Sequence, residues 1–134
     1  MTHSMQLQPS PFEMVRDGTK TIELRLYDEK RKKIRIGDTI VFTNTASKEV
    51  LKVKVLELFV FDSFEALYSR LPLAECGYTK EDIGTASPDD MNAYYPKEMQ
   101  QQYGVVGIKI ALIPGVSVHC PGQRSCGRRN RSGQ

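Results

Sequence analysis

The feature that most constrains the fold is the longest β-rich run of the chain, residues 49–61. It is rich in Val, Leu and Phe and is interrupted by Lys52, Lys54 and Glu57. A strand of this length usually bends or carries a bulge. Bending of that kind curls a sheet toward a barrel. The sequence therefore predicts a curled sheet rather than a flat one.

Further strands are predicted on both sides of a helical stretch. Weak alternation predicts a first strand over residues 5–8, and stronger patterns predict strands that begin near Lys20 and at Thr39. The last strand is predicted over residues 104–112. We expect an α+β fold, a small barrel of about five to six strands with helices covering its ends.

The first helix is predicted from a capping pattern. Ser10, Pro11 and Glu13 have the spacing of an N-cap, a first-turn proline and a capping-box acid. They predict a short helix that ends near Asp17, where Gly18 suits the left-handed conformation that closes a helix. The residues expected on its core side are Phe12 and Val15.

The helical stretch in the middle of the chain has similar signals. Asp62 or Ser63 caps a helix that ends near Arg70. Residues 87–95 begin with a second Ser-Pro-x-acid pattern and predict another helix, which a proline ends, and residues 97–103 predict a further short piece.

The length of 134 residues indicates one domain. No apolar run approaches the roughly 20 residues of a membrane span, and the N-terminus lacks a signal-peptide pattern. We therefore expect a cytoplasmic protein with no membrane partner. His119, Cys120 and Cys126 offer three ligands where a structural zinc site needs four, so we expect no metal and no other cofactor.

The formal charge of +3 arises at the C-terminal end of the chain. From residue 114 onward there are four arginines and no acid, and without them the 19 basic residues become 15 against 16 acidic ones. We expect residues 1–113 to form the domain and residues 114–134 a disordered basic tail. The tail is either a functional arm or, as we favour because its composition changes abruptly, a non-native extension.

The strand that follows Gly18 has one apolar and one charged side. Ile22, Leu24 and Leu26 alternate with Thr21, Glu23 and Arg25, so we expect the apolar set to face a core and the polar set to face away from it. In a regular strand, residues 20 and 23 point to opposite faces. Lys20 therefore joins Glu23 in one cleft only if it lies on the turn before the strand or beside a bulge.

A run of basic residues follows this strand. It consists of Lys30, Arg31, Lys32 and Lys33. A local basic patch recruits polyanions even when the whole protein is nearly neutral. The alternative interpretation is a solvated loop without a specific function.

Three motifs in order resemble the ASCH domain, a small relative of the PUA domain, over residues 5–113. They are the G-x-K-T-I-E-L-R motif from Gly18, the I-x-x-G-D-x-I-x-F motif from Ile34, and the Y-Y-P and Y-G-V-V-G-I segments from Tyr94 and Tyr103. The resemblance implies a β-barrel with a cleft between barrel and helices where a nucleotide or RNA binds.

One branch of the ASCH domain family resembles very small amidohydrolases that remove an acyl group from N4-acetylcytidine. These use a lysine, a threonine three residues later and a distant glutamate. Lys20 matches the lysine, whereas Glu23 stands at the threonine position. A carboxylate can act as a general base but does not provide a hydroxyl. Glu75 and Glu81 are both candidates for the distant glutamate.

We favour RNA or a nucleotide as the partner. In this hypothesis Lys20, Arg25 and the run of Lys30, Arg31, Lys32 and Lys33 hold phosphates, Thr21 lines the cleft, and Glu23 contacts a base edge or amine. Tyr94 and Tyr95 offer a stacking surface, although tyrosines at the end of a helix are more often packing residues.

The alternatives are catalysis and a partner protein. As an amidohydrolase, the chain would use Lys20 as a base with help from Glu23 and from Glu75 or Glu81. A lysine base needs a pKa well below its usual value of about 10.4, which Arg25 would favour and Glu23 would oppose. In the third case Glu23 and Arg25 form a surface ion pair of little consequence, and the protein acts through a protein partner.

Overall fold

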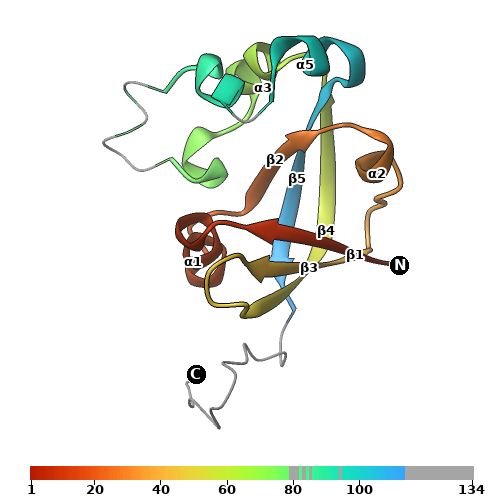
Figure 1. The fold of residues 1–134 in the computed structure, drawn as a ribbon, viewed down its shortest axis with the longest axis vertical. Helices are drawn as coiled ribbons and strands as arrows, with labels where there is room; N and C mark the ends of the chain where they lie inside the picture. Colours follow the sequence, from red (N-terminus) through yellow and green to blue (C-terminus); the bar gives the residue numbers. More distant parts are fainter. Residues whose placement is uncertain (79–81, 83, 85, 94, 114–134) are drawn as a thin grey trace, which may run out of the picture.

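The computed structural model describes residues 1–78, 82, 84, 86–93 and 95–113, and these form an α+β fold built on one five-stranded sheet (Figure 1). The strands are β1 (Thr2–Leu7), β2 (Ile22–Leu26), β3 (Thr39–Asn44), β4 (Val50–Phe61) and β5 (Val105–Leu112). The helices are α1 (Pro9–Asp17), α2 (Glu29–Lys32), α3 (Phe64–Arg70) and α5 (Lys97–Tyr103), with 3₁₀ helices η1 (Leu73–Cys76) and η2 (Pro88–Ala93). The tail predicted to be disordered lies outside the described residues.

The sheet is a half-barrel with the strand order β1-β3-β4-β5-β2. β1 pairs with β3 in parallel, and the other neighbouring strands are antiparallel. The register between β4 and β5 shifts between Val55 and Glu57, which confirms the irregularity predicted for the long strand. β1 and β2 are the two edges of the sheet, and both lie on the face seen in Figure 1.

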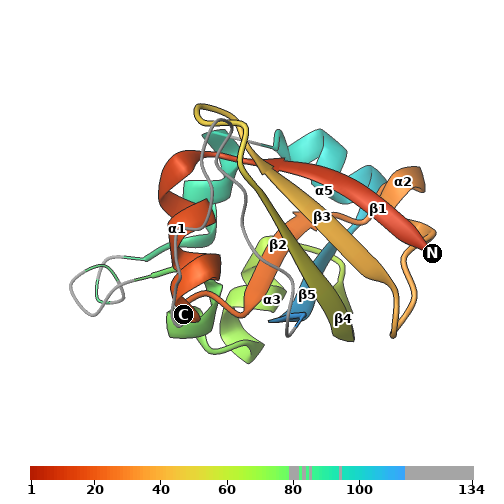
Figure 2. The same cartoon turned by 90° about the horizontal axis from the view of Figure 1, so that it is seen from below.

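The sheet is buried on both sides because two hydrophobic clusters pack against it. The first core joins the sheet to α1 and contains Phe12, Phe42, Val53 and Ile108. The second core lies under α3 and η1, against β2 and the start of β5; its members are Ile22, Leu24, Leu26, Phe64, Leu67, Cys76 and Val105. Figure 1 shows α3 and α5 together at one end of the molecule, and Figure 2 shows α1 and α2 on opposite sides of the curled sheet.

The first strand and the first helix both begin earlier than predicted. β1 begins at Thr2 because its parallel register with β3 starts at the pair Thr2 and Thr39. α1 begins at Pro9, since a proline suits the first helical position, and Gln8 is the N-cap without a side-chain hydrogen bond. The prediction that Ser10 is the N-cap is therefore wrong. Phe12 and Val15 are buried, as predicted, and the left-handed Gly18 (φ 84°) closes the helix.

The remaining helices are mostly as predicted. The Ser63 side chain caps α3 by accepting a hydrogen bond from the main-chain N of Ala66. The second Ser-Pro-x-acid pattern forms a 3₁₀ helix, in which the Asp90 carboxylate accepts from the main-chain N of Ser87. The possible turn of helix at 79–83 lies largely outside the described residues.

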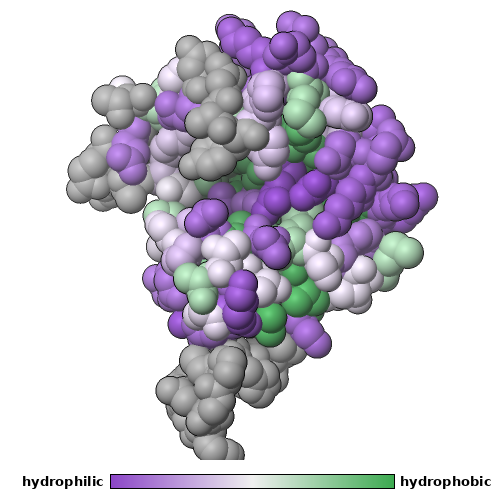
Figure 3. Space-filling model, viewed as in Figure 1, coloured by the Kyte–Doolittle hydropathy of each residue, from purple (hydrophilic) through white to green (hydrophobic). Residues whose placement is uncertain are grey.

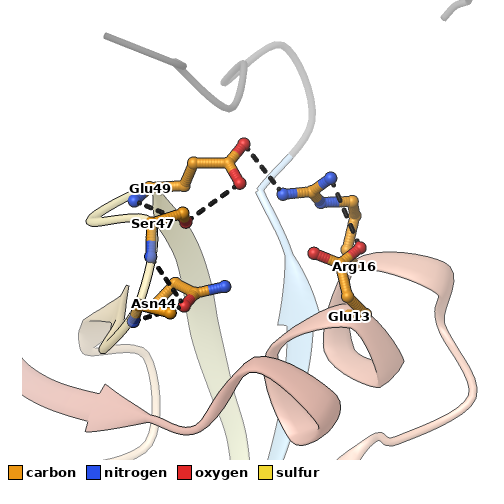
Figure 4. A network of polar contacts seen from close by, with 6 residues as sticks. Glu13, Arg16, Asn44, Ser47 and Glu49 are labelled. Carbon is orange, nitrogen blue, oxygen red and sulfur yellow. Dashed lines mark hydrogen bonds and ion pairs between the residues drawn. The ribbon is translucent and has the colours of Figure 1, made fainter.

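A polar network fixes α1 to the turn between β3 and β4 (Figure 4). Arg16 lies 3.3 Å from Glu13 on its own helix and donates through Nη2 to Glu49 at 3.0 Å. Asn44 holds the turn, because its Oδ1 accepts from the main-chain N of Ala46 and Ser47. These contacts fix the orientation of α1 and therefore the position of Gly18 and the residues before β2.

Candidate functional site

The polar side of β2 does not face solvent. Glu23 pairs with Ile108 and Arg25 with Val106, so both polar residues lie on the side of the sheet that carries the first core. Only 5% of the Glu23 surface is exposed. The apolar residues of β2 pack into the second core instead. The expectation that the polar set turns away from a core is therefore wrong, because both faces of this strand are covered.

Lys20 lies on the turn before β2, which begins at Ile22. Its main-chain N donates to the carbonyl O of Met14, just after the left-handed Gly18. Because Lys20 precedes the regular strand, its side chain does not follow the alternation of β2. This is the condition under which the sequence predicted that Lys20 joins Glu23. Lys20 Nζ consequently lies 3.3 Å from Glu23 Oε1, although the two residues are three apart.

Three charged side chains form the centre of the site, which we call the charged triad: Lys20, Glu23 and Arg25. Lys20 Nζ donates to the carbonyl O of Cys76 at 2.7 Å. Arg25 Nε donates to Glu23 Oε2 at 2.7 Å. Arg25 Nη2 donates to the carbonyl O of Gln6 at 2.8 Å, which connects β2 to β1.

Burial of the charged triad costs free energy, because its charged groups lose contact with water. Lys20 is 7% exposed, and the side chain of Arg25 is 14% exposed. Burial alone would lower the pKa of Arg25, but the charges of Glu23, Tyr95 and Asp28 and the hydrogen bond to Glu23 together outweigh it, and the pKa of Arg25 is raised. Buried ion pairs seldom increase stability over apolar packing. Such an arrangement is more readily explained by a function than by folding.

Tyr95 lies near Glu23 and Arg25 of the charged triad, and Arg31 lies near Tyr95. The Tyr95 ring stacks on Phe64, with 5.9 Å between the ring centroids. Burial raises the pKa of the Tyr95 hydroxyl, while the charges of Arg25, Glu23, Arg31 and Asp28 act on it from nearby. The hydroxyl therefore stays protonated near neutral pH. Arg31 Nη1 lies 3.1 Å from Asp28 Oδ2.

The basic run lies mostly on a short helix, α2, rather than in a loop, because the Asp28 side chain caps this helix by accepting from the main-chain N of Arg31. Of its residues, Arg31 is turned toward the protein, whereas Lys30 and Lys33 are exposed. Lys32 lies 3.8 Å from Glu29 and above the ring of Tyr27. Figure 3 shows a band of hydrophilic residues across the middle of this face, where β1, β2 and α2 meet.

Thr21 and Glu75 form a neighbouring pair. Thr21 Oγ1 donates to Glu75 Oε1 at 2.9 Å, and Lys109 Nζ lies 3.8 Å from the same oxygen. The polar contacts of Glu75 thus differ from those of Lys20, which go to Cys76 and Glu23. Glu81 and Tyr94 lie outside the described residues.

Three groups that shape the site were not predicted from the sequence. Asp28 has a recognisable signal, since an aspartate three residues before Arg31 is a helix N-cap pattern. The other two are the carbonyl oxygens of Gln6 and Cys76. Every residue carries a carbonyl, so no side-chain pattern marks these two. Burial raises the pKa of the Cys76 thiol to about 11, so this side chain is not a nucleophile near neutral pH.

No helix in the described part of the chain has the length and apolarity to cross a membrane. No group of three or more His, Cys, Asp or Glu side chains there is arranged to hold a metal ion.

Comparisons with known proteins agree on one family. The family model of the ASCH domain matches residues 5–114. The crystal structure of a protein named PH0355 is 35% identical with a TM-score of 0.70, and the match covers 84% of this chain and 100% of that one. The solution structure of PF0455 from Pyrococcus furiosus is 33% identical with a TM-score of 0.63, covering 85% and 99%.

More distant structures share the fold. A crystal structure of an ASCH protein from Zymomonas mobilis is 15% identical with a TM-score of 0.54, and the match covers 82% of this chain and 68% of that one. Among curated proteins, none matches this chain.

Proposed function

Since this chain belongs to the ASCH domain family, we propose that it binds RNA or a nucleotide through the charged triad. The observation that carries the proposal is the sharing of one buried carboxylate, Glu23, by two cations, Lys20 and Arg25. The charged triad therefore has a surplus of one positive charge in a place with little access to water. An anionic, hydrogen-bonding ligand compensates this surplus better than water does.

The pairing of donor and acceptor suits a nucleobase. Lys20 Nζ and Glu23 Oε1 are 3.3 Å apart, and each retains hydrogen-bonding capacity beyond the contact they share. The edges of nucleobases also carry a donor beside an acceptor. Glu23 thus accepts from an amino or imino group while Lys20 donates to the neighbouring oxygen or nitrogen.

A salt-series titration with single-stranded and structured RNA tests this proposal. We expect binding near 50 mM salt that weakens as salt rises, and its loss when Lys20→Glu reverses a charge in the site. The matched control is Lys54→Glu, which makes the same change at an exposed position of β4. Equal losses in the two variants, or no binding by the unaltered protein, would contradict the proposal.

A second candidate is hydrolysis of an N4-acylated cytidine. It is supported by Lys20, which matches the lysine of the family's enzymatic branch, and by Glu75 in η1, which accepts a hydrogen bond from Thr21. However, Lys20 is arranged as a hydrogen-bond donor to a carbonyl and a carboxylate, as a binding lysine would be. Incubation with N4-acetylcytidine, with Lys20→Ala as the control, separates the two functions. Release of cytidine that depends on Lys20 would favour catalysis.

A further inference from the structure

Several hydrogen-bond donors beside the charged triad have no partner among the described residues. Arg25 uses Nε and Nη2, but its Nη1 makes no hydrogen bond there. Arg31 uses Nη1 for Asp28, whereas its Nε is buried without a partner and its Nη2 has none in the described part of the chain. The Tyr95 hydroxyl likewise lacks one among these residues, although its ring and main chain are fixed. Of these donors, Arg31 Nε is the buried one, and a buried donor is seldom left unpaired without a reason.

These donors come from three separate segments of the chain, and the charges of Arg25 and Arg31 both act on the Tyr95 hydroxyl. Arg25 lies on β2, Arg31 on α2, and Tyr95 just before α5. α2 begins soon after β2 ends, and the main-chain N of Tyr27 between them donates to the carbonyl O of Gly104 at the end of α5. The chain thus holds β2, α2 and the residues around α5 against one another without a ligand. The backbone segments that carry the donors are therefore in position before an acceptor binds.

The charges that act on Tyr95 from Arg25, Glu23, Arg31 and Asp28 cancel, but together with Lys20 the charged triad and its border carry one surplus positive charge. Lys20, Arg25 and Arg31 supply three positive charges, and two negative charges come from Glu23 and Asp28. A neutral nucleoside would leave the surplus positive charge uncompensated. A phosphodiester carries one negative charge and would compensate it.

We propose that Arg31, Arg25 and Tyr95 form a phosphate subsite, so that the charged triad takes a phosphorylated nucleotide in preference to a free nucleoside. This inference rests on the proposed function and specifies its ligand. Arginine suits this role because its planar donors match phosphate oxygens. Arg31 therefore has a different role from the exposed lysines of α2, which contribute only general attraction to anions.

The test is isothermal titration at fixed ionic strength with three matched ligand sets. These are the four ribonucleosides, their 3′-monophosphates, and the 3′-methyl phosphodiesters that represent an internal RNA phosphate. We expect the phosphorylated form of the preferred base to bind about tenfold more tightly than its nucleoside, the gain of one charge-assisted contact. A tighter diester indicates an RNA chain as the source, and a tighter monoester indicates a free nucleotide.

Two variants separate the subsite from general charge. Arg31→Gln should remove most of the preference for phosphate while nucleoside binding persists. Lys30→Gln removes the same charge from the exposed side of the same helix and should retain the preference. If Arg31→Gln does not fold, Tyr95→Phe removes a single hydroxyl and should also reduce the preference.

The outcomes distinguish this inference from the proposed function. Nucleosides that bind as tightly as their phosphorylated forms would overturn the phosphate subsite but leave the function intact. Equal losses in Arg31→Gln and Lys30→Gln would also overturn it. Failure of every nucleoside and nucleotide to bind would overturn both.

Discussion

Arg25 on β2 donates through Nη2 to the carbonyl O of Gln6 on β1, over a distance of 2.8 Å. The two strands are the edges of the sheet, so a side chain of the candidate site links the open ends of the half-barrel. The same guanidinium holds Glu23 through Nε. The arrangement of the site and the closure of the sheet therefore depend on one residue.

Arg25→Lys tests this link. An ammonium group cannot reproduce the two directed bonds that the guanidinium makes to Glu23 and Gln6. We expect faster amide hydrogen exchange in β1 and β2, with little change in β3 and β4, whose pairing is unaffected. Uniform protection across the sheet in the variant would show that the link has no structural effect.

Glu23→Gln tests whether the charged triad is a buried network. The substitution leaves Lys20 and Arg25 without their shared counter-ion, and loss of one partner from a buried pair costs roughly 3 to 5 kcal/mol. We expect a fall in the free energy of unfolding toward the lower part of that range, measured by urea denaturation, since the amide still accepts hydrogen bonds. A change below about 0.5 kcal/mol, as for an exposed pair, would contradict the account.

The Gly77→Ala substitution tests the backbone conformation next to the Cys76 carbonyl. The φ of Gly77 is +106°, and an added Cβ would lie 3.4 Å from Cδ and Nζ of Lys20. We expect Gly77→Ala to lower the free energy of unfolding by about 1–2 kcal/mol, because an L-residue is strained in this conformation. Gly84→Ala is the control, since a Cβ there meets nothing within 4 Å. Similar effects of the two substitutions would argue against strain at Gly77.

Asp38 should make stability depend on pH below about 4. Its hydrogen bonds with His3 and with the main-chain N of Arg35 lower its pKa from 3.8 to about 2. A carboxyl with a lowered pKa stabilises the fold above pH 3.8, and this contribution is lost as the pH falls through about 2.

The measurement is the Tm of the unaltered protein and of Asp38→Asn across this range. The unaltered protein should melt at a higher temperature at pH 6, and the difference should shrink between pH 4 and pH 2. A difference that does not change with pH would contradict the assignment.

The sequence predicted most elements of the fold, because their signals are local. The irregularity in β4, the Ser63 cap and the Gly18 closure each depend on a few neighbouring residues. The burial of the charged triad could not be predicted from such local signals. Alternation along β2 separates two faces, but whether both are buried depends on β5, α3 and η1, which are distant in the sequence.

The site itself was predicted in part. Lys20, Glu23 and Arg25 are adjacent in the structure, as the motif suggested, whereas Thr21 contacts Glu75 outside the charged triad. The basic run was predicted as one patch, but a helix spreads its residues around an axis. Among its four residues only Arg31 is partly buried, where Asp28 holds both its main-chain N and its side chain.

Binding of a nucleotide at the charged triad is tested by a map of amide chemical-shift changes in the ¹⁵N-labelled protein as a mononucleotide is added. We expect the largest changes at Lys20 to Arg25, at Asp28 to Arg31 and at Tyr95, and we expect Lys20→Glu to abolish them. Changes centred on the exposed side of β3 and β4, or equally large changes in the Lys20→Glu variant, would contradict it.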